Sequence, residues 1–178
     1  MLFRSAIAET PSMEVLLSTT TVTTTVSSID LTFDESLYAS VRFEMSHLAL
    51  TSDGVLELRT SSDDGSSYDG GSSDYSYAQL STVANVTDNT ADHMRLTASH
   101  GASTNEDASG VYTLVDPSDG TKFTHVYGNS VMRSSSSLPV IGSMGGMRKE
   151  NAVVNGVRFL PSSGSISGGT IRMIGVLK

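Results

Sequence analysis

The alternation of apolar and polar residues between positions 29 and 60 is the feature that most constrains this fold. In the run Ile29-Asp30-Leu31-Thr32-Phe33 every second residue is apolar, and the same period recurs in residues 41–45 and 56–60. A period of two places the apolar side chains on one face of an extended strand. Three such runs within about thirty residues leave no room for a helix between them, so we predict antiparallel strands.

The rest of the chain also favours strands. Residues 15–26 are rich in Thr and Val, whose branched side chains favour extended structure. Residues 111–115 and 123–127 flank a turn that contains Pro and Gly, which predicts a hairpin. The pattern weakens between 78 and 109, where we expect two short strands around a polar turn at 87–92 and a loop at 100–110. We therefore predict an all-β fold, an antiparallel β-sandwich of jelly-roll-like type.

Two features near the C-terminus refine this prediction. Gly142, Gly145 and Gly146 follow a short apolar segment and indicate a bulge or a tight loop. Residues 171–177 are almost continuously apolar. This composition is typical of a central strand that is buried on both faces.

The length of 178 residues is that of one domain, and such a domain buries about 70% of its unfolded surface. We predict a single sandwich over residues 14–178, preceded by an extended N-terminal arm at 1–13. Pro11 interrupts the arm, whose apolar residues Leu2, Phe3 and Ile7 are unusual in a free tail. Two interpretations remain: the arm folds back on its own domain, or it contacts a neighbouring subunit or the surface of a larger assembly.

Composition excludes several classes of function. The chain has no cysteine, so disulfides, thiolate metal sites and Cys nucleophiles are excluded. Its formal charge of -8 disfavours nucleic-acid binding, and Arg148-Lys149 with Arg133 is the best basic cluster available. There is no uninterrupted apolar segment of the length that secretion or a membrane span requires. We expect neither nucleic acid nor membrane as a partner.

The Ser- and Asp-rich segment 61–74 raises the question of a metal site. Asp63, Asp64, Asp69 and Asp74 carry the oxygen atoms that calcium prefers. The spacing of an EF-hand, with its closing Glu, is absent. We therefore expect an ordinary solvated loop, with no metal and no other cofactor.

Tyr68, Tyr75 and Tyr77 lie in or just after this loop. Tyr75 and Tyr77 are two residues apart, so both rings lie on one face of the next strand. They could belong to the edge of the core, to a subunit contact or to a platform for a sugar ring. We favour the core interpretation and keep the loop as a candidate ligand-binding or interface region.

No catalytic signature is present. His47, His93, His100 and His125 are scattered, and none is part of a recognisable motif. The segment GSISG at 164–168 has Ile166 at the position where a nucleophile elbow requires Ser. We therefore predict that the protein is not an enzyme.

The residues with the clearest strand and turn patterns also carry a family resemblance. SSIDLTF, a following Tyr-containing strand and TSDGVLELRTSSDDGSSYD are followed at the far end by GVRFLPSSGSISGGTIRMIGVLK. Together these segments resemble a β-sandwich module of bacteriophage virion proteins, such as capsid-decoration, tail-fibre and tail-spike proteins. The resemblance covers about residues 22–77 and 153–178. It implies a protein of the virion surface that forms oligomers, and its motifs identify a scaffold more than a role.

Two functions follow as expectations. The first is a non-enzymatic capsid decoration or cement protein, made in the host cytoplasm and located in the virion. Its partners would be copies of itself, for example in a trimer, and the major capsid protein or tail proteins. We favour it because no coiled-coil or fibre segment precedes the module in this sequence. The second is a tail-associated module, a fibre, spike or adaptor, that binds a host-surface glycan.

Overall fold

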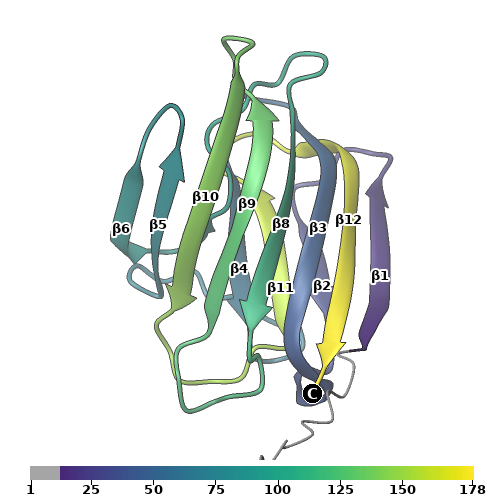
Figure 1. Ribbon diagram of the computed structural model, residues 1–178, viewed down its shortest axis with the longest axis vertical. Helices are drawn as coiled ribbons and strands as arrows, with labels where there is room; N and C mark the ends of the chain where they lie inside the picture. The colour runs from purple at the N-terminus through teal and green to yellow at the C-terminus, as the bar shows by residue number, and fades with distance from the viewer. Residues whose placement is uncertain (1–12) are drawn as a thin grey trace, which may run out of the picture.

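The computed structural model describes residues 13–178, which form a sandwich of two antiparallel sheets (Figure 1). The predicted all-β sandwich is confirmed. In the larger sheet the order is β1 (Glu14–Val22), β12 (Ile166–Leu177), β3 (Tyr38–Leu50), β8 (Asp107–Val115), β9 (His125–Arg133), β10 (Pro139–Arg148), β5 (Tyr75–Ser81) and β6 (Val86–Ala91). In the smaller sheet it is β2 (Ile29–Thr32), β11 (Gly156–Pro161), β4 (Leu56–Ser61) and β7 (Met94–Arg95).

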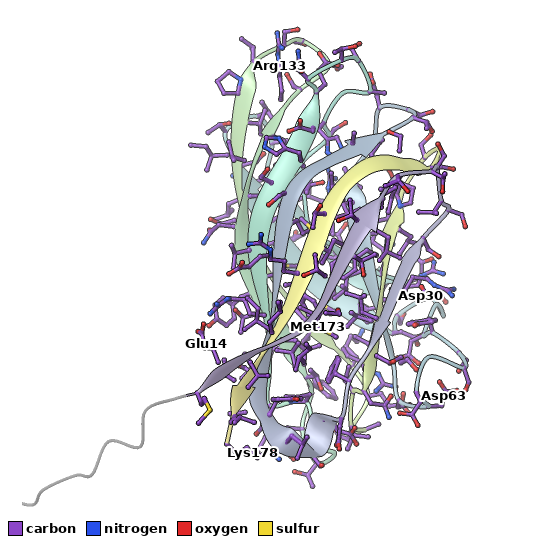
Figure 2. All side chains as sticks on the ribbon, turned by 90° about the vertical axis from the view of Figure 1, so that its right-hand side faces the viewer. Glu14, Asp30, Asp63, Arg133, Met173 and Lys178 are labelled. Atoms are coloured by element: carbon purple, nitrogen blue, oxygen red, sulfur yellow. The ribbon has the colours of Figure 1, made fainter. Side chains whose placement is uncertain are left out.

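The core lies between the two sheets, where the apolar members of the alternating runs meet. Phe43 of β3 and Phe159 of β11 contact edge to face with ring centroids 5.4 Å apart, which joins the layers directly. An edge-on view shows the two layers, with Arg133 at one end of the sandwich and Asp63 and Lys178 at the other (Figure 2). The outward face of the larger sheet has no described element above it.

The strands predicted at 29–33, 41–45 and 56–60 are present as β2, β3 and β4, but they do not pair with one another. β2 and β4 flank β11 in the smaller sheet, and β3 lies between β12 and β8 in the larger sheet. Alternation determines which face of a strand is buried and carries no information about its neighbour. In this part of the chain β2 and β4 belong to one layer and β3, between them in the sequence, belongs to the other.

The predicted bulge or tight loop at Gly142, Gly145 and Gly146 is wrong. All three glycines lie inside β10, which keeps an unbroken register with β9 on one side and β5 on the other. Glycine has a low strand propensity of its own. The hydrogen bonds to both neighbouring strands therefore hold this segment extended.

Three further expectations need correction. Residues 87–91 form most of β6 instead of a turn, and residues 107–110 begin β8 instead of ending a loop. β12 is second from the edge, and it alternates: Ile171 and Met173 are buried whereas Arg172 is exposed. The predicted hairpin is confirmed as β8–β9, with longer strands than the pattern indicated.

Two inward glycines of the hairpin are explained by one aromatic ring. Tyr112 of β8 is buried, and its hydroxyl donates a hydrogen bond of 2.8 Å to the carbonyl of Leu96. A Cβ atom at Gly128 would lie 2.5 Å from the Tyr112 ring, and one at Gly110 would lie 3.0 Å from it. Both positions therefore need glycine to leave space for the ring.

The predicted arm residues Leu2, Phe3 and Ile7 lie outside the described residues. Between residues 13 and 178, no helix is long and apolar enough to cross a membrane.

Candidate binding face of the larger sheet

The outward face of the larger sheet carries neighbouring apolar side chains on β5, β8, β9 and β10. Ile141 lies directly opposite Val131, and Val111 is a diagonal neighbour of Val131. Leu80 is a diagonal neighbour of Ile141. We call Leu80, Val111, Val131 and Ile141 the apolar patch; these residues are between 45% and 61% exposed. Clustered exposed side chains of this kind are typical of a contact surface.

The half of the face formed by β1, β12 and β3 is different. Arg42 of β3 makes two hydrogen bonds to the carboxylate of Glu14, of 2.6 and 2.8 Å, and lies 3.3 Å from Glu44. The hydrogen bond from Arg42 lowers the pKa of Glu14. The hydroxyls of Thr21 and Thr170 also bond each other across β1 and β12. Polar groups on this half satisfy one another.

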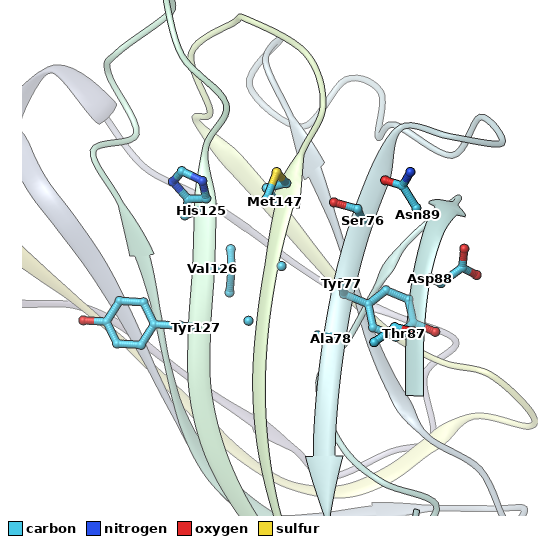
Figure 3. Close-up of a pocket in the computed structure, with 12 residues that line it drawn as sticks. Ser76, Tyr77, Ala78, Thr87, Asp88, Asn89, His125, Val126, Tyr127 and Met147 are labelled. Atoms are coloured by element: carbon cyan, nitrogen blue, oxygen red, sulfur yellow. The ribbon is translucent and has the colours of Figure 1, made fainter. Parts of the chain in front are cut away.

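A groove of about 680 Å³ lies on the outward face at the end of β9 where His125 begins the strand. Its lining comes from four strands: residues 76–78 of β5, 87–89 of β6, 125–127 of β9 and 145–147 of β10. We call it the glycine groove. Figure 3 shows His125 and Tyr127 on β9, Met147 on β10, and Ser76 and Asn89 on β5 and β6.

Gly145 lies in the middle of this lining. It is opposite Tyr127 on one side and Ala78 on the other. A Cβ atom at Gly145 would meet no atom within 4 Å. At the adjacent Gly146, which points inward, a Cβ atom would lie 3.0 Å from the sulfur of Met94. Internal packing thus explains Gly146 and leaves Gly145 unexplained.

The polar groups around the glycine groove are hydroxyls, amides and one carboxylate. Ser76, Thr87, Asp88 and Asn89 come from β5 and β6, and His125 comes from β9. The lining contains no Lys or Arg. Tyr127 on β9 also lines the groove and is 56% exposed. The groove therefore offers a flat apolar surface with hydrogen-bonding groups and little charge.

The three tyrosines singled out in the sequence lie in three different environments. The Tyr75 hydroxyl is hydrogen bonded to the amide of Thr60 at 2.8 Å, and burial raises its pKa to about 12. Tyr77 is half-buried against the core and stacks on His93, and burial also raises its pKa. Tyr68 lies under the guanidinium of Arg158 at 4.1 Å. The ring of Tyr75 is therefore core and has no surface to offer a ligand.

The carboxylates of Asp63, Asp69 and Asp74 in the loop have partners within the protein, and Asp64 is bonded through its backbone amide. Asp63 accepts hydrogen bonds from Ser61 and Ser67, mainly the latter, which lower its pKa to about 2. Asp74 accepts one from the amide of Gly71. In the described part of the chain no cluster of three His, Asp or Glu side chains is placed to hold a metal ion.

Asp69 pairs with Arg148, the first residue of the best basic cluster in the sequence. The Nε atom of Arg148 lies 2.6 Å from a carboxylate oxygen of Asp69, and Arg148 is buried. The amide of Asp64, the remaining aspartate, bonds the side chain of Asn155. Arg148 is therefore an internal partner of the loop and offers no charge to a nucleic acid.

A histidine–carboxylate cluster that sequence reasoning missed lies beside the stacked Tyr77. His93 places one ring nitrogen 2.7 Å from Asp92 and the other 3.4 Å from Glu57. Burial raises the pKa of Glu57. Arg59 bonds both the side chain and the carbonyl of Asp92. The cluster joins β4 to the segment between β6 and β7, and Glu57 and Asp92 are too far apart in the sequence for spacing to reveal it.

The groove residues Tyr127 and Gly145 were not among the predicted site residues. The signal that could have found them is the pair of alternating runs in residues 125–133 and 139–148, once both are recognised as strands.

Comparisons with known proteins give few similarities. No protein-family model and no curated protein matches the sequence. Among solved structures, exo-inulinase from Aspergillus awamori is 10% identical over 92% of this chain, with a TM-score of 0.44. This chain spans 29% of the exo-inulinase chain. A protein of unknown function from Bacteroides ovatus is 12% identical over 53% of this chain and 44% of its own, with a TM-score of 0.25. At these TM-scores the similarities carry no argument about function.

Proposed function

We propose that this protein is a non-enzymatic β-sandwich module that assembles through the outward face of its larger sheet, as a structural protein of a bacteriophage virion. In this proposal it is a capsid decoration or cement protein, located on the particle, and it binds copies of itself and the shell. The observation that carries the assembly role is the apolar patch. The virion role rests on the sequence resemblance.

The apolar patch supports assembly because its four side chains are neighbours on a regular sheet. Strands β9 and β10 alternate strictly between buried and exposed residues, so these side chains cannot turn into the core without a change of register. Burial of exposed apolar area in a contact stabilises it by about 25 cal/mol per Å². The half on β1, β12 and β3 also exposes Leu16, but the pairs Arg42–Glu14 and Thr21–Thr170 already occupy the polar groups beside it.

The test is the oligomeric state of the full chain by sedimentation velocity across a range of concentrations. We expect oligomers that the double variant Val131→Asp, Ile141→Asp converts to monomers with an unchanged circular dichroism spectrum. Thr19→Asp is the matched control, because Thr19 is exposed on β1 and lies opposite Arg172. A wild-type protein that stays monomeric at the highest concentration would contradict the assembly role.

The virion role has a separate test. An antibody against the protein, imaged on purified particles, should label the head in many copies if the chain is a decoration protein. Label confined to the tail would move the proposal to a tail-associated module. Absence of label from the particles would exclude both.

A second candidate function is the recognition of a host-surface glycan by such a tail-associated module. One observation favours it: the glycine groove combines an exposed tyrosine with hydroxyl and amide groups. Tyr75, for which a sugar platform was the alternative to the favoured core position, is buried and cannot take part.

A further inference from the structure

We propose that the glycine groove is a binding site for an uncharged carbohydrate, whose ring lies over Gly145 between Tyr127 and β6. This inference deepens the second of the two proposed functions and does not depend on self-association.

The first step is that Gly145 has no internal reason to be glycine. It is exposed, its φ is not positive, and a side chain there would enter open space. The inward glycines of the neighbouring strand positions are different, because Gly128 and Gly146 each face an atom that a Cβ would strike. A glycine inside a strand often marks a bulge or a place where another molecule approaches the backbone. The register of β10 is unbroken at Gly145, whereas that of β12 shifts on both sides of Gly168, so a bulge explains Gly168 and not Gly145.

The second step is the shape around Gly145. Its neighbours across the sheet are Ala78 and Tyr127, and Ala78 is itself opposite Thr87. Across the four strands the two smallest residues, Gly145 and Ala78, thus lie next to each other, with a tyrosine on one side and a threonine on the other. A flat ring can reach the sheet at this point and contact the exposed aromatic side chain.

The third step is the charge of the lining. Asp88 is the carboxylate, and no Lys or Arg contributes to the lining to neutralise a phosphate, a sulfate or a uronic acid. Lys149 is close by, but its Nζ donates a 2.7 Å hydrogen bond to the carbonyl of Asn89. With a net charge of -8 on the whole chain, an anionic ligand is disfavoured.

The fourth step is the distribution of polar groups. Hydroxyl groups of Ser76 and Thr87 and the amide of Asn89 lie along one side of the groove, and His125 lies on another strand. The carboxylate of Asp88 already accepts hydrogen bonds from the amide and the hydroxyl of Thr90. Groups that can donate and accept hydrogen bonds on both sides of an apolar floor suit a ligand covered with hydroxyls. A purely apolar peptide would leave these groups without partners on binding.

The experiment is a glycan array with neutral and anionic glycans, followed by calorimetric titration of the wild-type full chain with the oligosaccharides that it retains. We expect neutral oligosaccharides to bind. The variant Gly145→Val fills the floor of the groove and should weaken binding at least tenfold, while the melting temperature stays equal or rises by about 1–3 °C.

Two variants serve as comparisons. Gly168→Val is the matched control, because a Cβ atom at Gly168 of β12 also meets nothing within 4 Å. It should bind the same oligosaccharides as tightly as the wild type. Tyr127→Ala should weaken binding by about five- to tenfold, the usual contribution of one aromatic contact.

The outcomes of the glycan-binding experiment can be told apart from those of the test of self-association. Retention of anionic glycans alone, or of no glycan, would overturn the inference even if the protein forms oligomers. Equal affinity in the wild type and in Gly145→Val would place any glycan site elsewhere. Binding that is lost in Gly145→Val and kept in the double variant Val131→Asp, Ile141→Asp would support the groove independently of the apolar patch.

Discussion

The two faces of β8, β9 and β10 differ in whether contacts within the protein explain the residues found there. On the inward face Tyr112 fills the space above Gly110 and Gly128, and its hydroxyl has a partner. On the outward face of the same strands Val131 and Ile141 are exposed, and Gly145 faces open space. The inward residues are explained by the fold alone.

This difference has a physical meaning because both faces belong to the same strands. Backbone hydrogen bonds, register and twist are shared, so the contrast comes only from what lies above each face. The inward face is complementary to the smaller sheet. The outward face has comparable apolar character over β9 and β10 and no partner among the described residues, which is why both proposals place their partners there.

The largest effect is expected from adding one methyl group to the inward face. A Cβ atom at Gly128 would lie 2.2 Å from the carbonyl oxygen of Val111, a backbone atom that cannot move without breaking the ladder. We expect Gly128→Ala to lower the free energy of unfolding by about 4 kcal/mol, at the high end for overpacking. Gly145→Ala on the outward face should change it by less than about 0.5 kcal/mol. Urea denaturation of both variants measures the contrast, and equal losses would show that Gly145 is also packed.

The next largest loss of stability is expected when the buried side chain of His100 takes up a proton. His100 is fully buried, and burial lowers its pKa to about 4, although Asp107 and Asp53 act in the opposite direction. The folded state therefore binds its proton less readily than the unfolded state, whose histidine pKa is about 6.5. Stability is full above pH 6.5 and falls between pH 6.5 and 4, by about 3 kcal/mol in total.

The measurement is the difference in unfolding free energy between the wild type and His100→Leu as a function of pH. The difference isolates His100 because the carboxylates titrate in both proteins. If the two curves stay parallel between pH 6.5 and 4, the histidine is not held neutral by burial.

A smaller effect is expected at Tyr75. Its hydroxyl accepts from the buried amide of Thr60 at 2.8 Å, so Tyr75→Phe leaves that amide without a partner. We expect a loss of about 1–2 kcal/mol in thermal or urea unfolding. The control Tyr127→Phe removes an exposed hydroxyl and should change stability by less than about 0.5 kcal/mol. A neutral Tyr75→Phe would mean that water reaches Thr60 and that the ring is less enclosed than the structure shows.

The inward face was largely predictable from the sequence, and the outward face was not. The runs at 29–33 and 41–45 predicted which side chains are buried because burial imposes a period of two. The run at 56–60 did so only in part, because Glu57, expected on the solvent face, is buried as well. Neighbours were not predictable, since β2 and β4 pair with β11, about a hundred residues away in the chain. The same limit applies to the Glu57–His93 contact, which only the pairing of β4 with β7 creates.

The candidate site was missed for a related reason. The tyrosines at 68, 75 and 77 were singled out because they lie in or just after the loop. Tyr75 is core, as the favoured interpretation had it, and Tyr68 contacts Arg158. The groove combines segments from four strands, and its central residue is a glycine that the sequence indicated as a bulge or loop. A glycine inside a strand is recognised only when the space above it is known.

The smallest effect is the one that tests the comparison most directly. Val126 and Val131 belong to β9, the first buried and inward, the second exposed and outward. Replacement by Thr keeps the branched shape and adds one hydroxyl, which costs about 1 kcal/mol where it is buried without a partner. At low protein concentration Val126→Thr should show this cost and Val131→Thr less than about 0.5 kcal/mol. At concentrations where the wild type is oligomeric, Val131→Thr should become destabilising, because the same hydroxyl is then buried in the contact. A cost for Val131→Thr that does not change with concentration would show that this part of the face is not the surface through which the protein assembles.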